Sequence, residues 1–308
     1  VGEAISGQAR ILWIDGAPLE IDGLRLGGAD YAVALDGRAA IADRGLTVDG
    51  EIALDLGDLS RFSALAGQPL TGSIRGTLDG GGDPLGGLFD AELAISGTGL
   101  STGIAEADAL IATGIRIEGR AARDQRGLRV DGLRVAGDGL TLALDGRIAP
   151  AQSDIRLDLA LARAERLVPQ LPGDLSVTGT AGRMGEGPWR LDLDLDAPQG
   201  ITARIDGTAD PAGAIEADFE AAIAEVARLA PDFSGPATLS GTVRQQDGVT
   251  LLDTSATGPL GVSAEISARL AEQISAQITA RLPDIAPLAP GLSGALSLDG
   301  TVVQDGES

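Results

Sequence analysis

The sequence contains no cysteine, no histidine and no lysine, and only 2% of its residues are aromatic. Without cysteine and histidine, the chain has no disulfide framework, no zinc finger and no Cys–His or Ser–His catalytic pair. Without lysine, it lacks both a P-loop and a Schiff-base nucleophile. Its aromatic residues are too few for base stacking or for the aromatic girdles of a membrane barrel. We therefore expect no catalytic residue, no metal site and no cofactor, and predict that the protein is not an enzyme.

The charge is strongly negative, because all 23 basic residues are arginine and 45 residues are Asp or Glu, which gives a net charge of −22. This charge would repel nucleic acid, so we expect no nucleic-acid partner. The hydrophobic fraction of 44% is higher than in acidic disordered chains, so the composition indicates a folded protein. The 45 glycines indicate many short strands joined by turns.

Internal repeats organise the chain. Residues 22–40 and 131–149 share eleven of 19 positions, and Gly119, Gly179, Gly241 and Gly300 recur about every 60 residues in similar surroundings. We predict one continuous repeat array over residues 1–308, with approximate repeats at 1–68, 69–112 (shortened), 113–172, 173–234, 235–293 and the start of another at 294–308.

Within each repeat, apolar and polar residues alternate, as in Ile155–Leu161 and Arg190–Asp196. A period of two is typical of a strand with one buried and one solvated face. The strand spacing favours an antiparallel meander of about 18–20 strands, roughly four per repeat. The Asp-Gly glycines Gly37, Gly146 and Gly207 are predicted to lie inside strands, at bulges or kinks, rather than in hairpin turns.

Most repeats end in a short segment with helical spacing of apolar residues. We expect one or two helical turns at each of residues 58–66, 164–171, 225–231 and 283–289. The predicted fold is therefore all-β: an elongated, repetitive antiparallel sheet with short helical connectors.

A long open sheet with one apolar face would aggregate, so the sheet must close or curl. A barrel is disfavoured by the lack of aromatics and a β-helix by the long repeat, which favours a sheet curled into a hydrophobic groove. A dry sandwich core is the competing interpretation. The predicted groove carries aliphatic side chains: Val33, Leu35, Ile52, Leu54, Leu140, Leu142, Leu157, Leu159, Leu193, Leu195, Ile201, Ala203, Ile205, Ile266 and Leu270.

Other motifs have simpler explanations. Asp192, Asp194 and Asp196 share one strand face and could bind calcium, but a solvated negative face is the favoured interpretation. The strings at residues 80–87 and 185–189 contain several glycines yet lack the lysine and helix of a phosphate loop, so hairpin turns are expected. For Trp189, capping of a turn is favoured over anchoring at a lipid interface.

Taken together, residues 58–80 (DLSRFSALAGQPLTGSIRGTLDG), residues 292–302 (LSGALSLDGTV) and the ALDGR strands resemble the translocation and assembly module inner-membrane subunit (TamB) family. This family belongs to the AsmA-like bridge-like lipid transfer proteins. The resemblance implies a periplasmic β-groove that carries phospholipid acyl chains between the inner and outer membranes. It further implies an inner-membrane anchor and an outer-membrane barrel partner of the TamA type. We expect the chain to be an internal piece of a longer protein, with the anchor outside it.

Two classes of function fit these observations. The first is a conduit for phospholipid acyl chains. The second is a periplasm-spanning scaffold or chaperone that assists outer-membrane protein assembly by pairing strand edges. An extracellular adhesin repeat is a weaker third.

Overall fold

The computed structural model describes residues 5–14, 19–42, 45–83, 85–111, 113–167, 169, 171–271, 273–289 and 291–305. The chain divides into two compact units, Val1–Pro169 and Gln170–Ser308, called here the first and second units. In both units the described residues are mostly β-strand. The predicted all-β fold is therefore confirmed.

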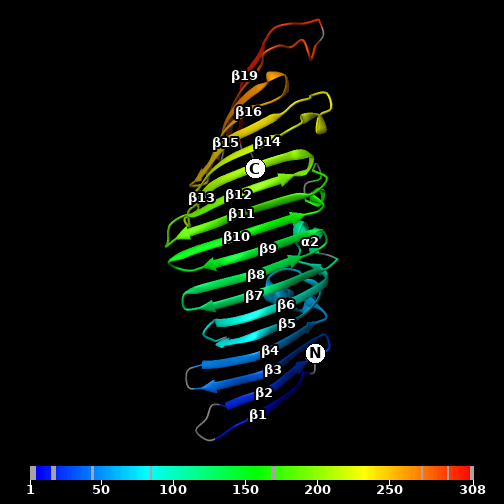
Figure 1. The fold of residues 1–308 in the computed structure, drawn as a ribbon, viewed down its shortest axis with the longest axis vertical. Coiled ribbons are helices and arrows are strands. Elements are labelled where there is room, and N and C mark those ends of the chain that lie inside the picture. Colours follow the sequence, from blue (N-terminus) through cyan, green and yellow to red (C-terminus); the bar gives the residue numbers. More distant parts are fainter. Residues whose placement is uncertain are drawn as a thin grey trace. The chain divides into compact units, whose positions relative to one another are not determined.

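The first unit contains ten described strands (Figure 1). They are β1 (Ser6–Leu12), β2 (Leu19–Gly27), β3 (Tyr31–Ala42), β4 (Gly45–Leu56), β5 (Thr71–Asp83), β6 (Leu88–Ser101), β7 (Ile115–Asp124), β8 (Gly127–Ala136), β9 (Leu140–Ile148) and β10 (Gln152–Leu161). From β1 to β10, each strand pairs antiparallel with its neighbour along the chain within this unit.

The second unit contains nine described strands in the same kind of meander. They are β11 (Leu175–Met184), β12 (Trp189–Ala197), β13 (Ile201–Ala209), β14 (Ile215–Ile223), β15 (Ala237–Gln246), β16 (Val249–Thr257), β17 (Ser263–Leu270), β18 (Gln273–Leu282) and β19 (Leu296–Asp305). The nineteen described strands agree with the predicted number.

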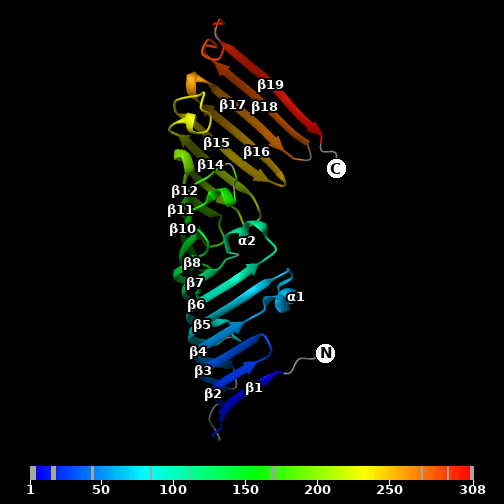
Figure 2. The same cartoon turned by 90° about the vertical axis from the view of Figure 1, so that its right-hand side faces the viewer.

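The two long edges of each sheet differ. Short turns join odd-numbered strands to the following even-numbered ones, and we call this side the hairpin edge. The opposite side, the connector edge, carries the segments that leave the even-numbered strands. These include η1 (Leu59–Phe62), α1 (Ser63–Ala66), α2 (Ala105–Ile111), η2 (Ala164–Arg166), η3 (Pro198–Gly200), η4 (Val226–Arg228) and η5 (Pro259–Gly261). Figure 2 faces the connector edge and shows α1 and α2 there.

Three of the four predicted helical connectors contain helical turns: η1 and α1, η2, and η4. The fourth, at residues 283–289, forms hydrogen-bonded turns but no helix among its described residues. The difference has a local cause. In η4 the Arg228 amide donates to the Glu225 carbonyl, but the equivalent residue, Pro287, has no amide hydrogen to donate.

The helix α2 lies where no helix was predicted. Its Asp108 accepts hydrogen bonds from the backbone amide of Thr102 (2.6 Å), from the Ser101 hydroxyl (2.7 Å) and from the Thr102 hydroxyl (2.9 Å). These bonds hold the pKa of the Asp108 carboxyl below its usual value, the amide of Thr102 contributing most. The side chain thus ties the helix to the end of β6.

Glycines let neighbouring strands approach closely at one point of the first unit. Gly37 of β3 and Gly50 of β4 are opposite each other, with φ of 159° and 137°. A Cβ on Gly37 would lie 2.1 Å from the Asp49 carbonyl oxygen, and one on Gly50 would lie 2.4 Å from that of Asp36. Only glycine allows this approach, so substitution would force the two strands apart.

The predicted Asp-Gly glycines all lie inside strands, namely Gly37 in β3, Gly146 in β9 and Gly207 in β13. Only the first lies at a bulge, where Asp36 and Gly37 together face Gly23 of β2. The related bulge in the second copy of the 19-residue repeat is at Asp131 and Gly132. Gly146 and Gly207 keep regular pairing, so neither is itself a bulged residue, although the β8–β9 bulge begins directly beside Gly146.

Candidate functional site

In the first unit, alternate residues of each strand point to the same side of the sheet and form a continuous apolar face. Its central row crosses eight strands by direct pairing: Val33, Leu54, Gly76, Ile95, Ile117, Val135, Leu142 and Leu159. The neighbouring row contains Leu35, Ile52, Leu78, Leu93, Gly119, Leu133, Leu144 and Leu157. All eight groove residues predicted for this unit lie on this face, since Leu140 pairs with Leu161 two residues further along the same strands.

The second unit has an equivalent face with smaller side chains. Its central row crosses nine strands: Gly179, Leu193, Ile205, Phe219, Gly241, Thr254, Ile266, Ile278 and Gly300. The predicted Leu193, Leu195, Ile201, Ala203, Ile205, Ile266 and Leu270 all lie on this face. Alanines and glycines occupy many of the remaining positions, which makes the face less bulky than that of the first unit.

The prediction missed most apolar residues of β5 to β8. Ile74, Leu78, Leu93, Ile95, Ile117, Leu133 and Val135 lie on the same face as the predicted residues. Alternation is present there, as in the sequence Leu93-Ala94-Ile95 and the sequence Ile115-Arg116-Ile117. Glycines and bulges interrupt it, so pairing across strands was needed to assign these residues to one face.

The apolar faces are largely uncovered. Among the described residues, only seven hydrophobic side chains are buried: Leu35, Leu59, Leu100, Ala149, Leu161, Ala164 and Leu282. The chain exposes 19309 Å² of solvent-accessible surface. Two separate globular proteins, each of half this chain's mass, would together expose about 14,400 Å². The excess agrees with sheets whose apolar sides have no second layer packed on them.

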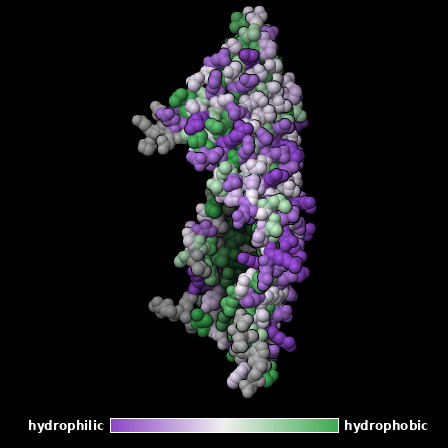
Figure 3. All heavy atoms as spheres, turned by 90° about the vertical axis from the view of Figure 1, so that its left-hand side faces the viewer, coloured by the Kyte–Doolittle hydropathy of each residue, from purple (hydrophilic) through white to green (hydrophobic). Residues whose placement is uncertain are grey.

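In the first unit the connector ends of β6 and β10 are covered and several hairpin ends are exposed, although Leu26 at the connector end of β2 is 40% exposed and Ala149 in the β9–β10 turn is 6% exposed. Leu161, at the connector end of β10, is 2% exposed, whereas Phe89, Ile41 and Ile148, at the hairpin ends of their strands, are 39%, 47% and 42% exposed. Figure 3 views the hairpin edge and shows a hollow over the first unit with hydrophobic atoms inside it and hydrophilic atoms on the opposite side. The groove is therefore open along its hairpin edge.

The opposite, polar face carries the charges, many of them in ion pairs. Arg204 bonds to three carboxylates, those of Asp192 (2.7 Å), Asp194 (3.1 Å) and Asp206 (3.0 Å). Hydrogen bonding to Asp206 and the charges of Asp192 and Asp194 raise the pKa of Arg204. The described residues contain no group of three or more side chains arranged to hold a metal ion.

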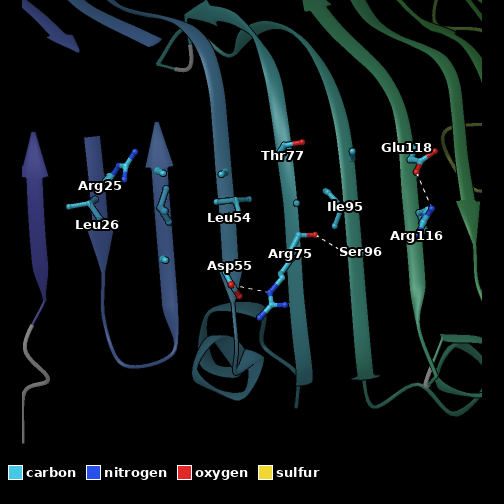
Figure 4. A pocket seen from close by; sticks show the side chains of 16 residues that line it. Arg25, Leu26, Leu54, Asp55, Arg75, Thr77, Ile95, Ser96, Arg116 and Glu118 are labelled. Atoms are coloured by element: carbon cyan, nitrogen blue, oxygen red, sulfur yellow. Dashed lines mark hydrogen bonds and ion pairs between the residues drawn. The ribbon is translucent and has the colours of Figure 1, made fainter. Parts of the chain in front are cut away.

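A depression of about 690 Å³ lies on the polar face of the first unit (Figure 4). Its small lining residues include Ala34, Ala53 and Ala94. Its arginines have carboxylate partners: Arg75 bonds to Asp55 at 2.9 Å, Arg116 lies 3.8 Å from Glu118, and Arg25 lies 3.9 Å from Asp36. With its positive charges balanced, this depression is a poor anion site.

An arginine braces the connector edge in three of the repeats. Arg61 contacts Asp30 (2.5 Å), Arg166 contacts Asp138 (2.7 Å), and Arg228 donates to the Gln199 carbonyl (3.1 Å). In each case the arginine of a longer connector reaches the shorter connector that precedes it.

Among these contacts, the carboxylate of Asp138 has two arginine partners. It also pairs with Arg163, and the Arg166 guanidinium donates further to the carbonyls of Ala109 and Asp138. The hydrogen bond from Arg166, followed by the charges of Arg163 and Arg166, lowers the pKa of Asp138. The cluster links α2, the β8–β9 connector and η2.

Two connectors of the second unit share a carboxylate staple. Glu225 accepts from the amides of Ala227 (3.1 Å) and Gly235 (2.8 Å), and Asp284 accepts from those of Ala286 and Gly294 (both 3.1 Å). The pKa of Glu225 is lowered by Gly235 and Ala227, and that of Asp284 by Ala286 and Gly294. These staples close both connectors with the same pattern of hydrogen bonds, although only the first contains a helical turn.

The remaining sequence motifs have structural roles. Residues 80–83 lie in β5 and residues 85–87 in the following turn, while residues 185–188 form the β11–β12 turn, so hairpins are present at both glycine-rich strings. Trp189 begins β12, and the Arg183 guanidinium lies over its ring, 5.2 Å from the centroid.

The search for similar proteins gave no match among family models, curated proteins or solved structures. Among the described residues, no helix combines the length and the apolar composition needed to span a bilayer.

Proposed function

We propose that this chain is a non-catalytic segment of a lipid conduit, whose apolar faces hold phospholipid acyl chains while headgroups remain in water. The observation that carries this proposal is the large aliphatic face of the first unit, of which few side chains are buried. When acyl chains cover this face, each Å² of apolar surface removed from water contributes about 25 cal/mol to the binding free energy.

The composition of the face supports a fluid ligand. The central row of the first unit consists of valine, leucine and isoleucine around a single glycine. Such a surface binds a flexible hydrocarbon without directional contacts, so a chain can move along it. The carboxylates and arginines of the polar face keep the other side of the sheet solvated.

The cellular setting follows from the sequence resemblance and is part of the proposal. A groove of this kind would carry phospholipids through the periplasm between the inner and outer membranes. The full-length protein would be anchored in the inner membrane and would meet a barrel partner of the TamA type.

The proposal is tested by a charge on the apolar face. Leu159 belongs to the central row, and the next residue, Ala160, lies on the polar face of the same strand. In the full-length protein, we expect Leu159→Asp to reduce crosslinking to a phospholipid with a photoreactive acyl chain at least about tenfold, because a carboxylate is costly to bury against hydrocarbon.

Two controls accompany this variant. Ala160→Asp introduces the same charge on the polar face, and Leu159→Met keeps the face apolar; both should crosslink like the wild type. Thermal unfolding is measured on all three. A folded Leu159→Asp variant with wild-type crosslinking would overturn the conduit, and its unfolding would favour an ordinary protein core.

A scaffold that pairs with client strands is the second candidate. Within the described part of the chain, β1 pairs only with β2, and Leu298 and Val302 of β19 are 59% and 53% exposed. A client strand could add at such an edge. Replacing Ser297 and Thr301 of β19 by proline would remove two amide donors, and we expect client capture to fall while lipid crosslinking at β10 persists.

A further inference from the structure

The strands β7 to β9 have a charge balance opposite to that of the whole chain. Residues 115–148 contain seven arginines and five carboxylates, whereas the chain has 23 basic and 45 acidic residues. Four of these arginines line a depression of about 450 Å³ at the hairpin edge of the first unit: Arg123, Arg126, Arg129 and Arg147.

The four arginines surround the open edge of the groove. Arg123 belongs to the apolar face, in a row with Phe89, Leu128 and Ile148. Arg129 and Arg147 pair with each other in register on the polar face, and Arg126 lies in the β7–β8 turn. Positive charge is therefore available on both sides of the edge and at its tip.

The carboxylates of the depression are already engaged. Asp90 accepts two hydrogen bonds from Arg120, at 2.7 and 2.8 Å, and these lower the pKa of Asp90. Asp124 accepts from the backbone amides of Arg126 (2.7 Å) and Gly127 (3.1 Å).

Of the four arginines of the depression, one is in an ion pair with a described residue and three are not. Arg129 is paired with Asp131 at 2.8 Å. Arg123, Arg126 and Arg147 form no ion pair with any other residue that the structure describes. Asp154 is opposite Arg147 in the register of β9 and β10 but forms no ion pair with it. Three guanidiniums without an ion pair at one edge of a protein with charge −22 are suited to an anion, and their planar donors match the oxygens of a phosphate.

We infer that Arg123, Arg126 and Arg147 bind the phosphate of a phospholipid whose acyl chains lie on the apolar face. This inference rests on the proposed function and adds the position and orientation of the lipid. The connector ends of β6 and β10, on either side of this depression, are covered by Leu100 and Leu161, so acyl chains enter here from the hairpin edge. The exposed Phe89 and Ile148 then contact the first carbons of the chains, beside the arginines that bind the headgroup.

The experiment compares two soluble ligands with the same acyl chains, dihexanoyl phosphatidylglycerol and dihexanoylglycerol, by calorimetric titration of the whole chain at low ionic strength. We expect the phospholipid to bind about tenfold more tightly, the contribution of one charge-assisted phosphate contact. The triple variant R123Q/R126Q/R147Q should lose this preference and keep its affinity for dihexanoylglycerol, which also reports an intact groove.

The matched control is R25Q/R75Q/R116Q, which removes the same charge from the depression whose arginines have carboxylate partners. It should retain the phospholipid preference within about twofold, since ion-paired surface arginines contribute little long-range attraction in the presence of their partners. Equal loss in both triple variants would show general attraction by net charge and would overturn the inference.

The remaining outcomes separate the inference from the proposed function. Equal binding of the two ligands by the wild type would refute the arginine site and leave the conduit standing. Binding of neither would refute both. Inorganic phosphate that binds as tightly as the phospholipid would show a phosphate site independent of the groove, which also contradicts the inference.

Discussion

The two units carry the same alternating pattern, but they cover their apolar faces to different degrees. Among the described residues, six of the seven buried hydrophobic side chains belong to the first unit, and Leu282 alone belongs to the second. The connectors explain the difference. The first unit has the four-residue helices η1 and α1 and the seven-residue α2, whereas the helical connectors of the second unit are three-residue turns. The connectors themselves are similar in length, so it is the longer helices of the first unit that supply more apolar surface to pack on the end of the sheet.

This comparison shows that alternation defines an apolar face and that the connectors determine how deep a groove it forms. Bulky aliphatic rows and helical covers occur together in the first unit. The second unit combines smaller side chains with shorter helices in its connectors. We therefore regard the first unit as the stronger candidate for lipid binding.

The largest difference in stability between the units is expected when a side chain is truncated at the end of β10 in the first unit or of β14 in the second. Each is the fourth strand of its repeat. Leu161 ends β10 and is 2% exposed, while the equivalent Ile223 ends β14 and is partly exposed. We expect Leu161→Ala to lower the free energy of unfolding by about 3 kcal/mol and Ile223→Ala by about half as much. Hydrogen exchange measured separately for each unit checks this. Equal losses would mean that the connectors of both units cover their sheets equally.

A second expected difference concerns the response to pH and salt. Asp138, Glu225 and Asp284 have lowered pKa values in the folded protein, so each stabilises it above the ordinary carboxyl pKa of about 4. That stability is lost as the pH falls through the lower, folded pKa. We expect amide protection at the connectors of both units to decrease over this range.

Salt should separate the two kinds of carboxylate. The pKa of Asp138 is lowered by a hydrogen bond from Arg166 and by the charges of Arg163 and Arg166, whereas the pKa values of Glu225 and Asp284 are lowered chiefly by backbone amides. Raising the ionic strength from about 0.01 to 1 M shortens the screening length from about 30 to 3 Å. The effect of Asp138→Asn on connector protection should therefore shrink with salt, and that of Glu225→Gln should change little. The reverse order would contradict the assigned causes.

The smallest expected effect is a difference in connector stability between two repeats of the second unit. Arg228 braces the η3 connector through the Gln199 carbonyl, while Pro287 occupies the equivalent position in the following repeat. We expect Arg228→Ala to lower the stability of its connector by about 0.5 kcal/mol, the lower end for one hydrogen bond. The wild-type connector at residues 283–289, which has no arginine at the equivalent position, serves as the internal reference. Exchange of the Gly200 and Ile201 amides would report the change.

Much of the fold could be predicted because strands follow local periodicity. The alternation in Ile155–Leu161 lies within β10, and the helical spacing in residues 58–66 matches η1 and α1. The helix α2 was not predictable, because seven residues do not form a stable helix alone and packing on β6 decides. The failed helix at residues 283–289 had a visible signal in Pro287, which cannot donate an amide hydrogen bond.

The candidate site was predictable in part. Alternation within single strands placed every predicted groove residue on the apolar face of its own unit. It did not connect the faces of β5 to β8, where bulges such as that at Asp131 and Gly132 shift the parity. The arginine cluster had no sequence signal beyond a local excess of arginine, since Arg123 and Arg147 come together only through the pairing of β7, β8 and β9.

The amino-acid sequence by itself determined a repetitive β-sheet with one aliphatic face and one charged face, because adjacent side chains of a strand point to opposite sides. Tertiary structure alone decided which end of that face is covered, which edge stays open and which arginines lack a carboxylate partner. These properties depend on the register between strands and on contacts between connectors, which join residues far apart in the chain and leave no periodic signal in it.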